Sequence, residues 1–353
     1  MSSQIPQNHK AAVAEKEGGS VNIVDVPTAK PGKGEILVQL KYSGVCHTDS
    51  HALIGDWPAH ASFPLIGGHE GAGTVVALGE GADKYHQIGD PVGLKWLYSS
   101  CLNCDFCAAG TEPNCQKAEC HGFTKNGTFQ QYAITDASHA TPIPKGLPLD
   151  AAAPLLCAGV TVYKAIKVAN LKPGQTLAIS GAGGGLGHLA CQYARAAGLK
   201  VIAIDTGDEK KKLCDSYGVS AFVDFAAEKD LVAAVKAASE DGLGPHAAVV
   251  AASGAKAYEQ ALEYLRPTGV LVPVGLPPNA TIKMDVFWSV FYSKQVRPSY
   301  VGNREDAKEC LQIADEGKVK VQYKVKGLSE LPQVYDDMHH GRIAGRIVLD
   351  LAR

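Results

Sequence analysis

Four cysteines close together in the sequence have the spacing of metal ligands. They follow the pattern C-x2-C-x2-C-x7-C at Cys101, Cys104, Cys107 and Cys115. Four thiolates this close together can form a tetrahedral zinc site with no open position, which makes such a site structural. A ferredoxin-like iron–sulfur cluster also uses repeated C-x2-C spacing, but its motif continues with a nearer fourth cysteine and a proline, and this chain lacks that pattern. The spacing favours structural zinc, with Cys120 and His121 nearby as residues that could compete for the metal.

A second set of metal-binding residue types is dispersed along the chain, at Cys46, His69 and Cys157. Spacing cannot identify dispersed ligands, so their neighbours carry the argument. His69 and Glu70 lie in a glycine-rich stretch over 67–73, and Cys46 begins the run Cys-His-Thr-Asp-Ser-His. These side chains coordinate metals and donate or shuttle protons. The residues alone therefore suggest a reactive site without defining its ligands.

A glycine-rich turn follows a short apolar segment over 176–180, which we expect to be a strand, and precedes an expected helix over 186–197. The turn reads Ser-Gly-Ala-Gly-Gly-Gly-Leu-Gly over 180–187. A turn in this context can hold a pyrophosphate with its backbone amides and the helix N-terminus. Gly181, Gly183 and Gly187 do not meet the strict G-x-G-x-x-G spacing, because the last two are separated by one residue more than in the motif. A plain flexible turn is the alternative.

Asp205 ends the next expected strand, which begins at residue 200. A carboxylate at this place accepts hydrogen bonds from an adenosine ribose and repels a 2'-phosphate. It therefore favours NAD over NADP, although an aspartate that merely caps a turn is the simpler interpretation. Lys210 could flank the same ribose or be solvated.

Two regions with different sequence patterns must position these groups. The first 150 residues resemble a β-rich domain of short segments bounded by Gly or Pro, for example over 35–40 and 73–78. After Pro154, expected strands alternate with expected helices, which predicts a doubly wound parallel sheet. The further strands are expected over 247–251, 269–274 and 346–350, and the further helices over 229–238, 256–265 and 306–316.

Composition narrows the class of protein. The 353 residues are enough for two domains. Lys and Arg number 34 against 36 Asp and Glu, so a nucleic-acid partner and a polybasic membrane anchor are disfavoured. The N-terminus lacks a signal-peptide pattern, and no apolar run is expected to span a bilayer. We expect a cytoplasmic protein whose ten cysteines stay reduced.

Taken together, these residues resemble the zinc-dependent medium-chain alcohol dehydrogenases, above all the yeast and fungal ethanol-oxidising type. Besides the four-cysteine lobe, the stretches that carry the resemblance are 42–49, 68–73, 156–159 and 299–304. The resemblance implies a GroES-like β-rich catalytic domain over 1–156 and 299–353, with a zinc lobe over about 98–118. It also implies a Rossmann NAD-binding domain over 157–298, two zinc ions per subunit, and a homotetramer.

By this resemblance, Cys46, His69 and Cys157 bind the catalytic zinc, and Asp49 bonds the far nitrogen of His69. Glu70 would lie near the metal. Thr48 would exchange a hydrogen bond with the alcohol oxygen, and the proton would then pass through the cofactor ribose to His51 and out to water.

The resemblance also implies the binding residues for cofactor and substrate. His47 and Arg346 would contact the pyrophosphate, and the turn would contribute Gly181, Gly183, Gly184, Gly185, Leu186 and Gly187. A narrow substrate pocket would be lined by Trp57, Trp96 and Leu276, which favours ethanol and other short primary alcohols.

Several alternatives share parts of this pattern. Polyol and glutathione-adduct dehydrogenases share the ligands, but the aromatic pocket and the lack of an anionic-substrate cluster disfavour them. A non-enzymatic descendant would be expected to lose a ligand or Thr48, and a zinc-free quinone reductase lacks the four-cysteine lobe. Pro298 is a departure that could alter the hinge between domains, and Cys191, Cys214 and Cys310 match no ligand role.

Overall fold

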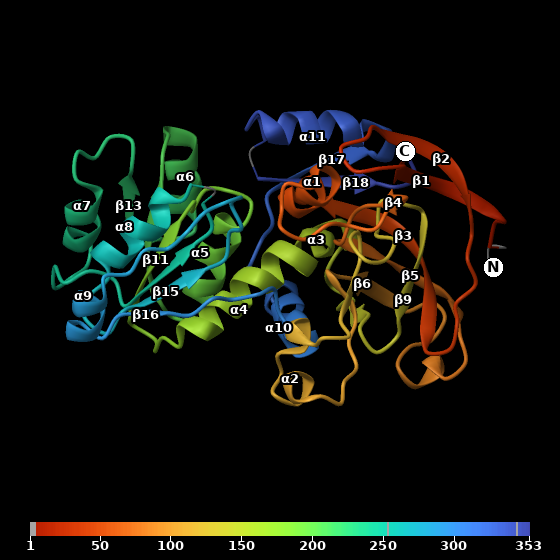
Figure 1. Cartoon of the computed structure of the whole chain (residues 1–353), viewed down its shortest axis with the longest axis horizontal. Helices are drawn as coiled ribbons and strands as arrows, with labels where there is room; N and C mark the ends of the chain where they lie inside the picture. The colour runs from red at the N-terminus through yellow and green to blue at the C-terminus, as the bar shows by residue number, and fades with distance from the viewer. Residues whose placement is uncertain (1–4, 253, 344) are drawn as a thin grey trace. The chain divides into compact units, whose positions relative to one another are not determined.

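The computed structural model describes residues 5–252, 254–343 and 345–353. The chain divides into two compact units, which are described separately (Figure 1). The first unit contains the residues up to Cys157 together with 303–315 and 321–353, and the second contains 158–302 and 316–320. The sequence-based limits had instead placed Cys157 in the second domain and left the C-terminal tail undivided.

The first unit is β-rich. Its largest sheet has the strand order β10-β6-β5-β3-β18-β17, with β9 paired to β3. These strands are β3 (Glu35–Val45), β5 (Gly71–Leu78), β6 (Pro91–Leu94), β9 (Tyr132–Asp136), β10 (Thr141–Pro142), β17 (Tyr323–Gly327) and β18 (Arg346–Asp350). The smaller sheets are formed by β1 (Asn8–Ala14), β2 (Val21–Pro27) and β4 (Leu65–Ile66), and by β7 (Leu97–Ser99) and β8 (Glu119–Cys120). The expected strands over 35–40, 73–78 and 346–350 are confirmed, the first two in lengthened form.

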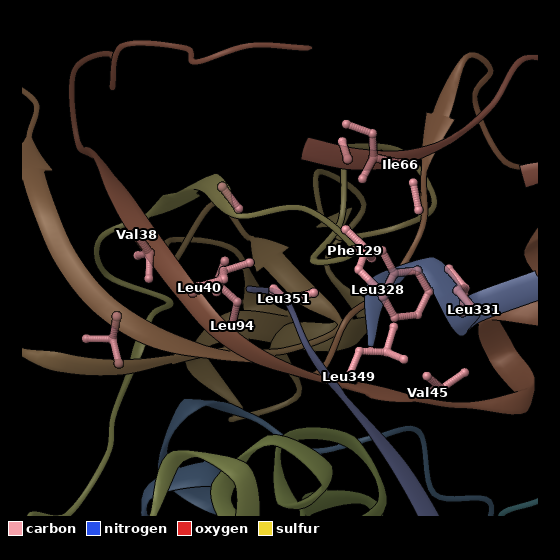
Figure 2. Packing of buried hydrophobic residues seen from close by; sticks show 14 of the residues in the cluster. Val38, Leu40, Val45, Ile66, Leu94, Phe129, Leu328, Leu331, Leu349 and Leu351 are labelled. Carbon is pink, nitrogen blue, oxygen red and sulfur yellow. The ribbon is translucent and has the colours of Figure 1, made fainter. Parts of the chain in front are cut away.

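A hydrophobic core packs beside the largest sheet and includes side chains along β3 as far as Val45 (Figure 2). Val38 and Leu40 of β3 pack with Leu94, Phe129 and Leu349 in one buried cluster. Burying an aliphatic side chain of this size contributes about 1.5–3 kcal/mol. Because β18 pairs antiparallel to β3 with Ile347 opposite Val45, the start of β18 lies beside the segment that leads into Cys46.

Helices of the first unit connect and cover its strands. They are α1 (His47–Ile54), α2 (Asp105–Ala108), α3 (Leu149–Pro154), α10 (Arg304–Asp315) and α11 (Leu331–His339), with short turns η1 (Ala82–Lys84), η2 (Glu112–Asn114) and η4 (Leu328–Glu330). Helix α10 confirms the helix expected over 306–316. Helix α1 was not predicted, because its sequence is mostly polar; Asp49 stabilises its start by accepting a hydrogen bond from the Cys46 N–H at 2.9 Å.

The second unit is a six-stranded parallel sheet with helices. Its strand order is β13-β12-β11-β14-β15-β16, the order of a Rossmann sheet. The strands are β11 (Thr176–Ser180), β12 (Lys200–Asp205), β13 (Ala221–Asp224), β14 (Ala247–Val250), β15 (Val270–Pro273) and β16 (Gln295–Val296). The helices are α4 (Val160–Ala169), α5 (Gly187–Ala196), α6 (Asp208–Ser216), α7 (Leu231–Ala237), α8 (Lys256–Tyr264) and α9 (Val286–Phe291). The predicted parallel doubly wound sheet is confirmed.

One helical stretch of the described chain, Leu149–Ala169, is long and apolar enough to cross a membrane by length and composition. This corrects the expectation that no apolar run reaches that length. However, 72% of its apolar window is buried inside the protein, as in a core helix.

Candidate active site

Three segments of the first unit bring four metal-binding side chains together. Cys46 lies between β3 and α1, His69 and Glu70 lie between β4 and β5, and Cys157 lies in a π-helical turn, η3 (Leu155–Gly159). Their candidate ligand atoms all lie within 4.8 Å of one another, and all four residues are buried. The structure therefore gathers Cys46, His69 and Cys157, which spacing could not connect.

Asp49 fixes the orientation of the His69 ring. Its Oδ1 lies 2.7 Å from Nδ1 of His69 and also accepts a hydrogen bond from the Gly68 N–H at 3.2 Å. Because a carboxylate accepts and does not donate, Nδ1 carries the proton. The opposite nitrogen, Nε2, is buried and finds no hydrogen-bond partner among the described residues. An unpartnered basic nitrogen beside two thiols fits a metal ion.

The pKa values of the two buried thiols shift in opposite directions. A hydrogen bond with Cys157 lowers the pKa of Cys46 well below its usual value, although burial opposes this shift, and the charge of Arg346 lowers the pKa further. The same hydrogen bond, together with burial, raises the pKa of Cys157. Two cysteines and one histidine are the known ligand set of the catalytic zinc in alcohol dehydrogenase. The donor set here fits zinc.

Glu70 and Arg346 form a buried ion pair next to this cluster. They are 0% and 4% exposed, and Nη2 of Arg346 donates to Oε1 of Glu70. Burial raises the pKa of Glu70 to about 7, although the charge of Arg346 opposes this shift. Arg346, expected to contact a pyrophosphate, thus has a carboxylate partner in the structure.

The four cysteines of the lobe also converge. The Sγ–Sγ distances are 3.5 Å for Cys101 and Cys115, 3.6 Å for Cys104 and Cys107, and 4.0 Å for Cys101 and Cys107. Sulfurs arranged tetrahedrally around zinc at about 2.3 Å lie about 3.8 Å apart. The cluster therefore fits a closed zinc site. Cys120 and His121 are not part of it in the described chain, and Nδ1 of His121 donates instead to the Lys95 carbonyl at 2.7 Å.

Residues distant in the sequence hold the lobe, and these were not predicted. Arg304, the first residue of α10, donates from Nε to Glu112 at 2.9 Å. Asn303 donates from Nδ2 to the Gly110 carbonyl at 2.9 Å. The stretch 299–304 carried part of the resemblance, but nothing in its sequence indicated these partners.

The predicted relay and pocket residues lie at different depths. Thr48 is half-buried and His47 is exposed, both in the first turn of α1. The rings of His51 and Trp57 stack with their centroids 4.8 Å apart, and the rings of Trp96 and His69 are nearly perpendicular with their centroids 5.3 Å apart. The structure therefore places both indoles beside predicted site histidines. Leu276 belongs to the second unit and is 60% exposed.

The glycine-rich turn of the second unit connects β11 to α5. Gly181 has a φ of 79°, a conformation that favours glycine. A Cβ atom at Gly187 would lie 2.0 Å from the Gly181 carbonyl oxygen, so this close approach also requires glycine. The turn follows the strand and precedes the helix as expected, with Gly183, Gly184, Gly185 and Leu186 between them.

Asp205 at the end of β12 is linked to this turn. Its Oδ2 accepts a hydrogen bond from the Gly183 N–H at 2.8 Å. Its Oδ1 accepts from Nζ of Lys210 at 2.8 Å and from the Thr206 N–H at 2.9 Å. The predicted carboxylate, lysine and glycine turn therefore form one connected group.

Comparisons with known proteins agree with both units. Residues 32–145 match the alcohol dehydrogenase GroES-like domain, and residues 185–316 match the zinc-binding dehydrogenase family. Alcohol dehydrogenase 1 of Emericella nidulans is 52% identical over 347 residues, covering 98% of this chain and 99% of that protein.

Solved structures give the same result. An alcohol dehydrogenase from Aeropyrum pernix has a TM-score of 0.87 at 30% identity, with 97% of this chain and all of that chain covered. The acetophenone reductase of Geotrichum candidum in complex with NAD has a TM-score of 0.86 at 27% identity, with 99% of each chain covered. Because the match to the Emericella protein spans nearly the whole chain, this chain belongs to the zinc-binding alcohol dehydrogenase family.

Proposed function

We propose that this chain is a zinc-dependent alcohol dehydrogenase that converts short primary alcohols and NAD reversibly into aldehydes and NADH. The observation that carries the proposal is the buried cluster of Cys46, His69 and Cys157 with its unpartnered His69 Nε2. In the forward direction, the alcohol carbon gives a hydride to NAD, and the hydroxyl proton leaves to a base and finally to water.

Cys46, His69 and Cys157 would hold the catalytic zinc, and the lobe cysteines would hold the structural one. When bound, the catalytic zinc supplies a Lewis acid that polarises the alcohol hydroxyl and favours loss of its proton. Asp49 keeps Nδ1 of His69 protonated and so leaves Nε2 as the ligand atom. Glu70, paired with Arg346 beside the cluster, contributes a further carboxylate close to the ligand atoms.

Proton removal is assigned to Thr48 and His51. The Thr48 hydroxyl can accept a hydrogen bond from the alcohol and donate one onward, because a hydroxyl does both. The half-buried His51 would receive the proton by way of the cofactor ribose and release it to water.

NAD binding is assigned to the glycine turn and Asp205 of the second unit. The turn offers backbone N–H groups at a helix N-terminus, and Oδ2 of Asp205, which accepts one hydrogen bond from Gly183, can accept a second. Lys210 holds the carboxylate in place and lies at the same edge. His47 and Arg346 are proposed to contact the pyrophosphate, and the related acetophenone reductase was solved with NAD.

We assign the restriction of substrate size to Trp57, Trp96 and Leu276. Trp96 is 7% exposed, and its ring lies nearly perpendicular to the His69 imidazole at a centroid distance of 5.3 Å. A bulky indole this close to a predicted ligand leaves little room for a branched substrate. Ethanol and acetaldehyde are therefore the proposed substrate pair. We place the reaction in the cytoplasm and assign it to ethanol fermentation.

A homotetramer is proposed for the assembly. Helix α9 exposes a run of large apolar side chains, with Val286, Phe287 and Phe291 77%, 64% and 65% exposed. An exposed apolar surface of this kind usually marks a protein interface. It lies near β16, the edge strand of the parallel sheet, as labelled in Figure 1.

The test is NADH formation with primary alcohols from methanol to hexanol and with isopropanol. We expect the highest kcat/KM with ethanol and a lower value for isopropanol. Cys46→Ser should lose turnover but retain NAD binding, because Cys46 lies in the first unit and the glycine turn in the second. A preference for branched or aromatic alcohols would contradict the substrate assignment, and normal turnover of the variant would contradict the role of Cys46.

A further inference from the structure

Helix α1 ends in a turn that brings Asp56 back to its last residues. Gly55 follows the helix with a φ of 74°, and its N–H donates to the His51 carbonyl at 2.8 Å. A side chain at this position would be strained by that φ, and its Cβ would lie 2.1 Å from Cδ of Glu17. Glycine is therefore required, and the reversal that it permits places Asp56 beside His51.

Asp56 contacts one nitrogen of His51 with both carboxylate oxygens. Nδ1 of His51 lies 2.8 Å from Oδ1 and 3.0 Å from Oδ2 of Asp56. Because the carboxylate only accepts, Nδ1 must carry the proton in this arrangement. The ring nitrogen left to accept a further proton is then Nε2.

Trp57 restrains the plane of the same ring. Its indole stacks on the imidazole with an interplanar angle of 22° and a centroid distance of 4.8 Å. The two residues after Gly55 therefore fix different features of His51: Asp56 fixes the protonated nitrogen, and Trp57 limits rotation of the ring.

From this geometry we infer that Asp56 is a positioning residue for the proton relay, which keeps Nε2 of His51 free to accept the proton released by the alcohol. The inference rests on the proposed function, in which His51 belongs to the relay. The proton arrives at Nε2, the ring then carries protons on both nitrogens, and Nε2 loses its proton to water. The Asp56 carboxylate balances the positive charge of the ring while both nitrogens are protonated.

Other charged groups around the turn have different partners or positions. Glu17, which packs against Gly55, accepts a hydrogen bond from Nδ1 of His60 at 2.9 Å. His47 lies in the first turn of the same helix and is exposed. Glu17, His60 and His47 must therefore be considered in any pH dependence assigned to His51. Asp56 is the carboxylate that is hydrogen-bonded to the His51 ring.

The test compares Asp56→Asn, Asp56→Glu, His51→Gln and the double variant His51→Gln/Asp56→Asn with wild type. The matched control is Asp25→Asn, which also removes a carboxylate from an exposed ion pair, the one with Lys10. Steady-state kinetics with ethanol and NAD are measured from pH 6 to pH 9, and melting temperatures show that each variant is folded. Asp56 is on the surface, with 35% of its side chain exposed, so its variants should fold.

We expect Asp56→Asn to lower kcat about tenfold, since a positioned base is worth about 10² to 10⁴ in rate and only its orientation is lost. KM for NAD should stay within about twofold. Asp56→Glu should restore part of kcat, and the pH profile should change shape in Asp56→Asn but not in Asp25→Asn. In the His51→Gln background, Asp56→Asn should have no further effect.

Three results would overturn the inference. Unchanged kinetics of Asp56→Asn at every pH, with His51→Gln impaired, would reject the role of Asp56 and leave the relay standing. An equal loss from Asp56→Asn with or without His51 would show a purely structural role. Normal kinetics of His51→Gln would instead reject the proposed relay and the inference with it.

Discussion

Gly44 lies so close to Glu70 that a Cβ atom at residue 44 would be 1.9 Å from Oε2 of Glu70. The absence of a side chain at the end of β3 therefore makes room for the carboxylate that pairs with Arg346. This relationship joins a strand residue to the buried ion pair beside the candidate zinc ligands.

Gly44→Ala should therefore displace Glu70 and weaken its pair with Arg346. Overpacking of a buried site costs about 1–3 kcal/mol, so the melting temperature should fall by several degrees. Gly254→Ala is the control, because a Cβ there would meet nothing within 4 Å. An equal melting temperature for Gly44→Ala and wild type would show that the site absorbs the methyl group.

Asp205→Ser should shift cofactor preference toward NADP. It removes a carboxylate that repels a 2'-phosphate, and it leaves Lys210, its ion-pair partner, available to that phosphate. We expect the ratio of kcat/KM for NADP to that for NAD to rise at least about tenfold, which corresponds to about 1.4 kcal/mol. Asp208→Ser, an exposed change in the first turn of α6, should leave the ratio unchanged. The same ratio in both variants would remove Asp205 from cofactor discrimination.

Cys104→Ser should reduce thermal stability more than it changes catalysis. The lobe cysteines form a closed cluster separate from Cys46, His69 and Cys157, so loss of their metal should unfold the lobe first. We expect a fall in melting temperature of at least about 5 °C, with kcat for the folded enzyme within about threefold. Cys120→Ser lies outside the cluster and should melt like wild type. Unchanged melting of Cys104→Ser would mean that the lobe holds no structural metal.

The sequence predicted those parts of the molecule that are local. The alternation of apolar segments predicted β11, α5 and β12 to within a residue, because each segment is buried as a unit. The four lobe cysteines were recognisable because they are neighbours in the chain. The pairing of Glu70 with Arg346 was not, since these residues come from opposite ends of the sequence and meet only through the register of β18 with β3.

Short-range features can also escape sequence reasoning. The hydrogen bond between His51 and Asp56 depends on the left-handed conformation of Gly55, and the sequence does not say which glycine adopts it. Cys157 lies in a π-helical turn that no periodicity indicates. From the sequence, its ligand role came only from the resemblance.

Lys95 should make stability depend on pH. The residue is 2% exposed, and its Nζ donates to the His139 carbonyl and to the Thr141 hydroxyl, both uncharged. Burial lowers the pKa of Lys95 to about 7, with the charge of Glu112 opposing the shift. In the unfolded chain a lysine titrates near about 10.4. Between these values the unfolded chain binds more protons than the folded chain, so stability rises with pH.

Lys95→Met removes this contribution while nearly keeping the volume of the side chain. The free energy of unfolding of wild type should rise by about 2 kcal/mol more than that of Lys95→Met between pH 7 and about 9. The melting temperature of wild type should therefore rise relative to that of Lys95→Met as the pH increases. Lys33→Met changes an exposed lysine paired with Glu80 and should show no such trend. A constant difference between Lys95→Met and wild type would mean that Lys95 stays protonated in the folded protein.

In the proposed enzyme, Cys46, His69 and Cys157 hold a metal ion. Anomalous diffraction from crystals of the purified protein, recorded on both sides of the zinc absorption edge, tests this most directly. We predict two zinc peaks per chain, one among these three residues and one among the four lobe cysteines. A peak at the lobe alone, in crystals of active enzyme, would contradict the claim.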